Sequence, residues 1–447
     1  MSQTIVPPAP AGGPSHSALT GPAGPGGTTP DAGTLGHRLA SASATIRHYL
    51  SGSPGRLRIV SGLAVLAAVL VALGGGAALQ ERSSALDEAK RSAAHLVLVQ
   101  SVQTRLVQAD ADVTNSFLGF GLEPVNQQLD YIASIQAAAR DLAIAANASA
   151  EDADQLGAAN AALTRYTGYI GSARANNRFG KPVGANYLST ASDLLRDSVV
   201  SKLQARAGAD DDKIESAYAR ATHASWWLAL VAVIGLGVLI WAQFYLARRS
   251  RRILNVPLAS ATVGLLAALI VAAGAMAVAQ SRANDVRDGA LADARSLSQS
   301  RVNAFDAKSR ESLTLIVRGS GATNEPLWKT SFDKAKSSLP VGNDEASTAL
   351  AAYEVQHQAI RKADDDGTWR VAVQAAISQS GTSANAEFAK YANATEETLT
   401  SEAKATTSGL ERAGNALLPA GILVLLVGLL AAAGAWFGIS LRLDEYR

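Results

Sequence analysis

Two apolar stretches joined by a short basic turn decide the fold of this chain. They read WWLALVAVIGLGVLIWAQFYL (226–246) and VPLASATVGLLAALIVAAGAMAVA (256–279), with Ala247-Arg-Arg-Ser-Arg-Arg252 between them. A bilayer core about 30 Å thick needs about 20 apolar residues in a helix that rises about 1.5 Å per residue. Both stretches meet this length, so the segment predicts a transmembrane hairpin.

The turn of the hairpin carries four arginines, Arg248, Arg249, Arg251 and Arg252. Lysine and arginine in short loops are enriched on the cytoplasmic side of membranes. We therefore expect the turn in the cytoplasm and the chain to leave the membrane outward on both sides of it.

Two further apolar stretches lie nearer the two ends of the chain. Arg56 and Arg58 precede the first of them, which places its start in the cytoplasm by the same rule. We predict a multi-pass plasma-membrane protein with both termini in the cytoplasm. Small residues at Gly74-Gly-Gly76 and Ala431-Ala-Ala-Gly-Ala435 would let these helices approach their neighbours closely.

The expected divisions of the chain follow from these stretches. They are a disordered Pro/Gly-rich cytoplasmic tail (1–33), a juxtamembrane amphipathic segment (34–58), the first span (59–79), a first external helical bundle (80–225), the second span (226–246), the basic cytoplasmic loop (247–255), the third span (256–279), a second external bundle (280–416), the fourth span (417–440) and a cytoplasmic end (441–447).

The hairpin is also the centre of an internal repeat. Gln80 and Gln280 follow their spans at an offset of 200 residues. Later landmarks recur near that offset: Gln100-Ser101 with Gln299-Ser300, Glu123-Pro124 with Glu325-Pro326, and Leu163, Tyr166 and Arg174 with Leu350, Tyr353 and Arg361. We predict a duplicated unit of membrane helix, external helical domain and membrane helix.

Both external regions read as helical. Apolar residues in the first helix follow alternating steps of three and four, the seam of a helical bundle: Val99, Val102, Leu106, Ala109, Val113, Phe117 and Phe120. Glycine, proline and asparagine mark helix ends at 119–124, 147–151 and 176–184. The second region shows comparable breaks at 319–326 and over an irregular stretch from 363 to about 383. The predicted fold is all-α, with two external domains like four-helix bundles.

Composition excludes several classes of function. The 447 residues carry a net charge of +2, which gives no reason to invoke nucleic acid, and contain no cysteine. Disulfides, thiol catalysis and zinc–thiolate sites are therefore absent. The six histidines have no metal-binding spacing, and the acidic runs Asp210-Asp-Asp212 and Asp364-Asp-Asp-Gly367 lack the register of a calcium loop. We expect no enzyme activity, no cofactor and no metal.

The segment before the first span offers a docking element. Leu35, Leu39, Ile46 and Leu50 lie at helical spacing with basic residues between them. This pattern fits a basic amphipathic helix at the inner membrane face or a docking site for a cytoplasmic partner. A solvated linker with some helical content explains the pattern equally well. The arginines of the 247–252 turn are the second candidate contact for a cytoplasmic partner.

The loop after the third helix of the first region is the most informative one. It runs Ala173-Arg-Ala-Asn-Asn-Arg-Phe-Gly-Lys-Pro-Val-Gly-Ala-Asn-Tyr187. Backbone N–H groups of a Gly-rich turn and nearby arginines can receive a carboxylate or the acidic edge of a partner. The alternative is a helix stop and a turn with no binding role. The candidate binding residues are Arg174, Asn176, Asn177, Arg178, Gly180, Pro182 and Gly184.

This loop, the four-span duplicated layout and the Ala-rich composition carry a resemblance. The run at 173–188 resembles actinobacterial membrane proteins of the GlnX type, and the long external bundles look like chemoreceptor ligand-binding domains. The resemblance implies a membrane component of amino-acid sensing, for ligands of the glutamate or aspartate type. It also implies an external substrate-binding lipoprotein and a cytoplasmic Ser/Thr kinase as partners. A homodimer would be compatible with this layout.

Three functional hypotheses follow. The first is a signal-relay receptor that senses a loaded binding protein, or an amino acid directly, and passes a helix displacement to a cytoplasmic partner. The second is a scaffold of the cell envelope without a ligand switch. The third, a small-molecule transporter, is disfavoured because no ionisable residue lies deep in a span.

Overall fold

The computed structural model describes residues 53–119, 125–148, 152–250 and 255–444. Within these ranges the secondary structure is helical, with no strand. The expected tail 1–33 and most of the segment 34–58 lie outside the described residues. Ser61–Glu445 form one compact unit, to which the following description applies.

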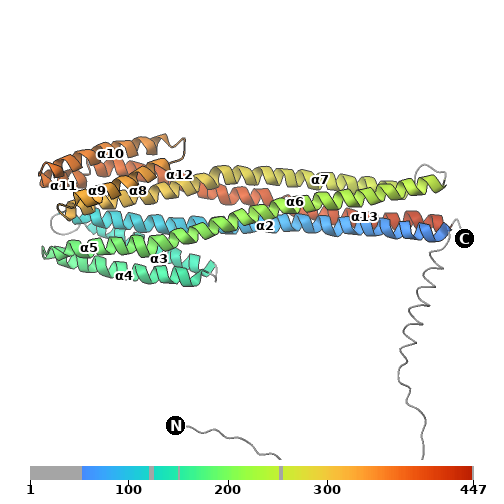
Figure 1. Ribbon diagram of the computed structural model, residues 1–447, viewed down its shortest axis with the longest axis horizontal. Coiled ribbons are helices and arrows are strands. Elements are labelled where there is room, and N and C mark those ends of the chain that lie inside the picture. The colour runs from blue at the N-terminus through green and yellow to red at the C-terminus, as the bar shows by residue number, and fades with distance from the viewer. Residues whose placement is uncertain (1–52, 120–124, 149–151, 251–254, 445–447) are drawn as a thin grey trace, which may run out of the picture. The chain divides into compact units, whose positions relative to one another are not determined.

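The chain folds as two halves that share a similar plan of long and short helices. The first half consists of α2 (Ser53–Phe117), α3 (Val125–Ala148), α4 (Ala153–Arg178), α5 (Val183–Leu194), the π-helical turn η1 (Leu195–Val200) and α6 (Ser201–Ser250). In both halves a long helix leaves one end of the unit, shorter helices pack at the other end, and long helices return (Figure 1).

The second half follows the 251–254 connection and has a similar plan of long and short helices. It consists of α7 (Val256–Val286), the π-helical turn η2 (Arg287–Leu291), α8 (Ala292–Ile316), α9 (Gly321–Ser337), α10 (Asp344–Asp365), α11 (Trp369–Ile377), α12 (Ala384–Gly414) and α13 (Leu417–Asp444). Here α8 packs on α9, α10 on α12, and α7 on both α12 and α13. The internal repeat and its origin by duplication stay predictions.

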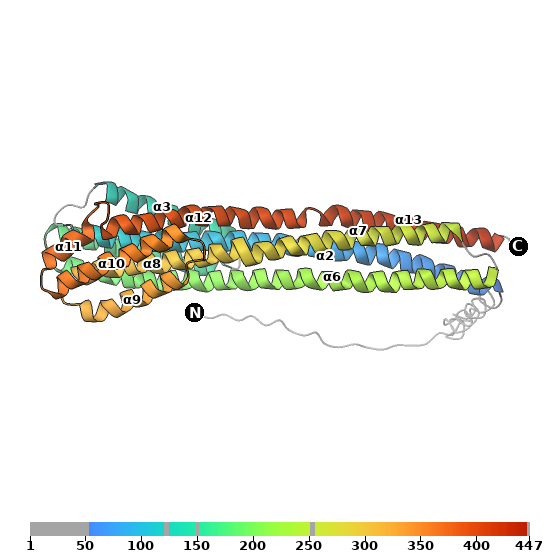
Figure 2. The ribbon, with the colours of Figure 1, turned by 90° about the horizontal axis from the view of Figure 1, so that it is seen from above.

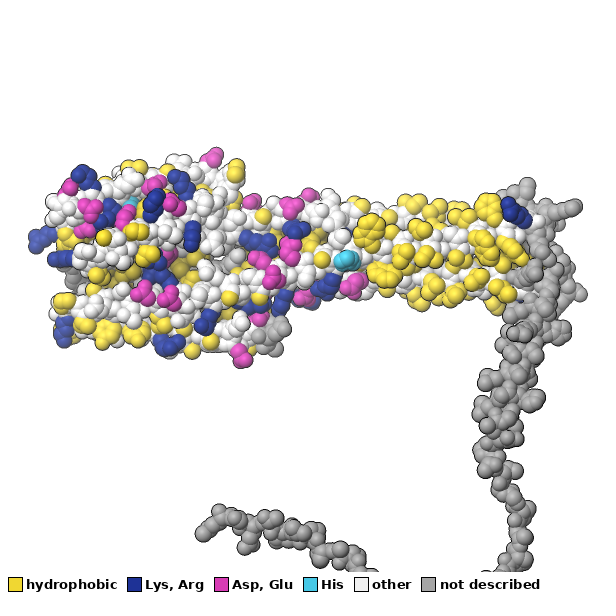
Figure 3. Space-filling model, viewed as in Figure 1, with side chains coloured by type: hydrophobic (Ala, Val, Ile, Leu, Met, Phe, Trp, Pro, Cys, Tyr) yellow, Lys and Arg dark blue, Asp and Glu magenta, His cyan; other side chains and the backbone are white. Residues whose placement is uncertain are grey.

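Four helical stretches are long and apolar enough to cross a membrane. They lie in α2, in α6, in α7 and in α13, where the sequence predicts the spans. Figures 1 and 2 show these four helices side by side at one end of the unit. Apolar side chains cover that end and charged side chains the other on the visible face (Figure 3). This is the architecture of a multi-pass membrane protein.

Small residues allow the apolar helices to pack closely, as predicted. A Cβ added at Gly75 would lie 2.9 Å from Val424 Cγ1, and one at Gly235 would lie 2.0 Å from Val71 Cγ2. A Cβ at Gly428 would fall 2.5 Å from that of Ala72. In lipid such close approach is a main source of helix association. Glycine therefore fixes how α2 packs against α6 and α13.

The core of the first helical region confirms the predicted seam. Val99, Val102, Leu106 and Val113 of α2 are fully buried. Tyr166, which lies on α4, is fully buried as well. Apolar residues at steps of three and four thus meet inside a bundle, as the heptad-like spacing requires.

The second half departs from the sequence prediction in two places. Residues 363–383 are not irregular throughout, because α11 forms within them. Trp369 begins α11; its Nε1 donates to the Leu315 carbonyl over 2.8 Å and its ring lies 3.7 Å from the Arg318 guanidinium carbon. The 319–326 break is also shorter than predicted. Gly319 takes a φ of 83°, and α9 resumes at Gly321, so Pro326 lies inside a helix.

Candidate functional site

The loop predicted as a candidate binding site, within 173–187, is a tight corner between α4 and α5. Gly180 takes a φ of 64°, a conformation that glycine adopts without strain. Gly184 is buried, and a Cβ there would lie 3.1 Å from both the Ala173 carbonyl oxygen and the Asn177 nitrogen. Asn176 turns back to donate to the Ser172 carbonyl over 2.8 Å. These three residues shape the corner. This is the helix stop and turn that the sequence offers as the alternative to a binding site.

The remaining residues of the predicted loop site divide into two groups. The guanidinium of Arg174 lies 4.4 Å above the ring of Tyr131, so it packs against α3. Arg178, Phe179 and Pro182 are exposed, and Phe179 exposes 78% of its surface. The loop therefore presents two cations, Arg178 and Lys181, and one large ring outward. Its role in binding remains a prediction.

Most of the predicted cytoplasmic docking residues lie outside the residues that the structure describes. Leu35, Leu39, Ile46 and Leu50 lie outside the described residues, as do Arg251 and Arg252. Arg248 is exposed near the end of α6, and Arg249 lies on the same helix.

A cavity of about 700 Å³ lies where the two halves meet. Helices α2 and α6 line it from the first half, and α8 and α9 from the second. Its lining is polar: Gln100, Gln103, Gln204, Asp211, Arg295, Ser296, Ser298, Gln299, Ser337 and Ser338, with Ala207 and Gly208. The Gln100 Oε1 atom is buried and has no hydrogen-bond partner among the described residues. The cavity thus holds a buried amide that a ligand could satisfy.

One ion pair crosses this cavity. Arg295 Nη2 of α8 lies 2.6 Å from Asp211 Oδ1 of α6. Burial raises the pKa of the Asp211 carboxyl above its usual range, although Arg295 acts in the opposite direction. Arg295 and Asp211 place a cation and an anion on facing walls, among the amides of Gln100 and Gln299. Such a set can bind a small molecule that carries both charges.

A buried polar network joins the halves farther along the bundles. Asp110 of α2 accepts hydrogen bonds from Ser192 of α5 at 2.8 Å and from Ser309 of α8 at 2.7 Å. Arg196 of η1 donates to Asp306 of α8 over 2.5 Å, and its Nη2 lies 3.6 Å from Asp110. Each half therefore supplies charges that the other half neutralises.

The pKa values of the two carboxyls in this network move in opposite directions. Burial raises the pKa of Asp110, against the attraction of Arg196 and the hydrogen bonds from Ser309 and Ser192. Burial also acts to raise the pKa of Asp306, but Arg196 and Arg310 outweigh it and hold that pKa below its usual range. Asp306 is thus the firmly ionised partner of Arg196.

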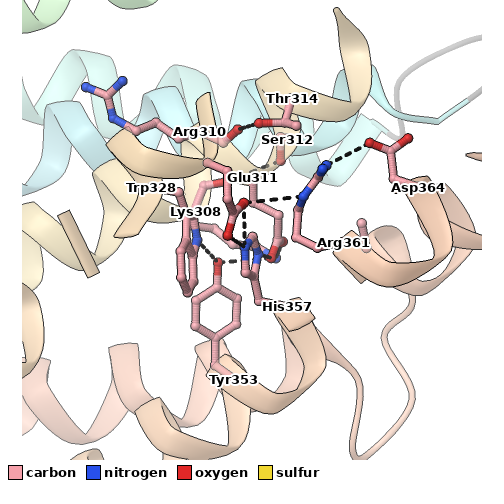
Figure 4. A network of polar contacts seen from close by, with 12 residues as sticks. Lys308, Arg310, Glu311, Ser312, Thr314, Trp328, Tyr353, His357, Arg361 and Asp364 are labelled. Atoms are coloured by element: carbon pink, nitrogen blue, oxygen red, sulfur yellow. Dashed lines mark hydrogen bonds and ion pairs between the residues drawn. The ribbon is translucent and has the colours of Figure 1, made fainter. Parts of the chain in front are cut away.

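A second buried network fills the core of the second half (Figure 4). Glu311 of α8 accepts from Lys308 Nζ at 2.6 Å, from His357 Nδ1 at 2.7 Å and from the Tyr353 hydroxyl at 3.1 Å. Burial opposes its charge, but Lys308 and His357 lower its pKa to about 2. Burial acts to lower the pKa of His357, but its hydrogen bonds to Glu311 and Glu325 outweigh burial and raise that pKa above its usual value.

The two networks share one element at corresponding positions. The Tyr166 hydroxyl donates to Asp110 over 3.3 Å, as the Tyr353 hydroxyl does to Glu311. Tyr166 and Tyr353 are landmarks of the predicted repeat. Their acidic partners were not predicted, because a lone buried Asp or Glu has no local signature. The only sequence signal that pointed to these positions was the predicted repeat, which pairs Tyr166 with Tyr353. The same repeat pairs Gln100 with Gln299, and both glutamines line the cavity between the halves.

Comparison with known proteins matches one part of the chain to a family of domains. Residues 85–219 match the family model described as the actinobacterial sensor domain. The chain has no significant match among curated proteins or among solved structures. The matched stretch runs from the outer part of α2 to the middle of α6, so it includes Asp110, Arg196 and Asp211. It supports a sensing role. No group of His, Asp and Glu suited to a metal ion occurs in the part of the chain that the structure describes.

Proposed function

We propose that this protein is a non-enzymatic transmembrane sensor that detects an external signal and relays it to a cytoplasmic partner. One observation carries the proposal. The stretch that matches a sensor domain, 85–219, begins on α2 and ends on α6, and both of these helices continue into stretches apolar enough to cross a membrane. A displacement of the external part is therefore transmitted along rigid helices without an intervening hinge loop.

The proposed orientation places the external bundles outside the cell. Four arginines in the 247–252 turn favour the cytoplasm for that turn, and Arg56 and Arg58 favour it for the N-terminal end. The charged end of the unit then faces the environment (Figure 3).

The proposed signal is a free amino acid of the glutamate or aspartate type. The cavity between the halves supports this class, because Arg295 fits an α-carboxylate and Asp211 fits an α-ammonium. The amides of Gln100, Gln103 and Gln299 then remain for a side-chain carboxylate. A ligand that replaces the Asp211–Arg295 contact would change how the two halves meet.

The proposed partners are an external substrate-binding lipoprotein and a cytoplasmic Ser/Thr kinase. The exposed corner with Arg178 and Phe179 is the proposed contact for the lipoprotein. Leu39 and Ile46 of the amphipathic stretch are the proposed contacts for the kinase.

Calorimetry on the purified full chain tests direct binding. Glutamate or aspartate should bind the wild type, and Asp211→Asn or Arg295→Gln should weaken binding about tenfold or more, since each removes one charge-assisted contact. Arg91→Gln, at an exposed arginine, is the control. Absence of binding in the wild type would reject direct sensing.

Crosslinking in cells tests the sensor role itself. A photoreactive residue at Phe179 should capture an external partner in an amount that changes when glutamate or aspartate is added. Arg178→Ala should lose this capture. A partner captured equally with and without amino acids would contradict a sensor and support a scaffold.

A further inference from the structure

The cavity at the outer ends of the apolar stretches has a different chemistry from the one between the bundles. It measures about 410 Å³ and lies between α6 and α7, with Arg82 of α2 at its polar end. Ser225 and Gln280 lie at that end beside Arg82. The rest of the lining is almost entirely apolar and includes Leu269 and Met276.

Arg82 is a buried cation whose partners are all neutral. It is 1% exposed, and its guanidinium donates to the Ala221 carbonyl at 3.1 Å, to Gln280 Oε1 at 2.6 Å and to the Ser225 hydroxyl. Its Nε has no hydrogen-bond acceptor among the described residues. No described carboxylate forms an ion pair with it.

The other two buried arginines of the described chain differ in this respect. Arg206 lies 2.9 Å from Asp152 and also contacts Asp210, and Arg301 contacts Glu396. An uncompensated buried ion costs several kcal/mol even after the protein relaxes. Arg82 therefore lacks the counter-ion that this chain supplies to its other buried arginines.

The dimensions of the apolar part fit one membrane leaflet. The lining extends from Thr222 to Ala232 on α6 and from Gln280 to Leu269 on α7. Ten or eleven helical residues span about 16 Å, and half of the apolar core of a bilayer measures about 15 Å. Trp226 lines the cavity at its polar end and is 73% exposed, as is common for tryptophan at the membrane–water interface.

We propose that this cavity binds an anionic phospholipid, with the phosphate at Arg82 and one acyl chain along the groove between α6 and α7. The phosphate supplies the missing counter-charge, and the chain covers apolar side chains over the depth of a leaflet. The bound lipid contacts three helices from both halves at the point where the external bundles enter the membrane. A free anion would satisfy Arg82 but would leave the groove unfilled.

Photolabelling of the full chain in detergent micelles tests the proposal. The probe is phosphatidylglycerol with a photoreactive acyl chain; phosphatidylcholine with the same chain and inorganic phosphate are the comparisons. Phosphatidylglycerol should label peptides of α6 and α7 about tenfold more than phosphatidylcholine, and Arg82→Met should remove that preference. Inorganic phosphate should not compete.

A second variant tests the groove without touching the charge. Ala273 lines the groove and is exposed, so Ala273→Leu fills the groove without overpacking a helix contact. It should lose labelling, while Ala267→Leu, at an exposed residue of α7 outside the groove, should label as the wild type does.

Three results would overturn the proposal. Equal labelling by both lipids would mean ordinary lipid contact, and competition by inorganic phosphate would mean a free-anion site. Undiminished labelling in Ala273→Leu would place the acyl chain elsewhere. If Arg82→Met fails to fold, the lipid preference of the wild type and the Ala273→Leu result decide the question alone.

Discussion

Arg196 of the π-helical turn η1 lies 2.5 Å from the Asp306 carboxylate of α8, so a largely buried ion pair joins the first half of the chain to the second. The Asp110 carboxylate lies 3.6 Å from Nη2 of the same guanidinium. The side chains of Asp110, Arg196 and Asp306 are 4%, 14% and 16% exposed. Arg310 also pairs with Asp306, at 2.8 Å. The junction of the halves is therefore electrostatic as well as apolar.

Arg196→Met should destabilise the protein by about 3–5 kcal/mol, because removal of one partner leaves buried carboxylates uncompensated. Thermal unfolding of the purified chain, followed by circular dichroism, measures the effect. Arg178→Ala, at an exposed residue, should change stability by less than about 0.5 kcal/mol. Equal stability of Arg196→Met and wild type would show that the ion pair is not structural.

Glu311 should make stability depend on pH in the acid range. Its pKa is lowered to about 2 in the folded protein from an ordinary value of about 4.5. Its contribution, about 3 kcal/mol, is therefore fully present above about pH 5 and is lost as the pH falls toward 2. The stability difference between wild type and Glu311→Gln should shrink over that window.

Denaturant unfolding between pH 3 and pH 7 measures this difference. Glu345→Gln, at an exposed residue of the same half, is the control and should show a small difference at every pH. A Glu311→Gln difference that stayed constant down to pH 3 would be inconsistent with the lowered pKa.

Gly235→Leu should weaken packing in the membrane, whereas Gly237→Leu should not. A Cβ at Gly235 would lie 2.0 Å from Val71 Cγ2, but one at Gly237 meets nothing within 4 Å. Overpacking of this kind costs about 1–3 kcal/mol. The melting temperature in detergent should fall for Gly235→Leu only, and equal values for the two variants would refute the close contact of α2 with α6.

Cysteine labelling should show both external bundles on one side of the membrane and the basic turn on the other. The chain has no native cysteine, so single cysteines at Ser149, Ser347 and Ser250 report without background. An impermeant thiol reagent added to intact cells should label the first two positions and leave the third unlabelled. Labelling of Ser250 alone would reverse the proposed topology.

Much of the fold follows from local patterns in the sequence. The spans, the seam through Val99 and Val113, and the corner at Gly180 and Gly184 each depend on residues close together in the chain, where spacing fixes the face of a helix. Helix α11 was missed, because a nine-residue helix between turn-forming residues gives too short a period to recognise.

The networks could not be predicted in the same way. Arg196 and Asp306 are 110 residues apart, and nothing local shows that α8 packs beside η1. The cavity between the halves had a partial signal in the repeated glutamines Gln100 and Gln299. The Arg82 groove had a weaker sequence signal. A charged residue just beyond a membrane span is common, and Arg82 is unusual only because its side chain is buried.

The π-helical turn η1 alters the phase of the long helix that α5 and α6 form together. Ala191, Leu195, Val199, Leu203 and Ala207 are buried at four successive steps of four residues. Such steps would drift around an α-helix, but a π turn closes its hydrogen bond one residue later and keeps them on one face. Rewinding η1 into α-helix would rotate everything beyond it by about one residue, or about 100°. The π-helical turn therefore sets the rotational position of α6 about its own axis.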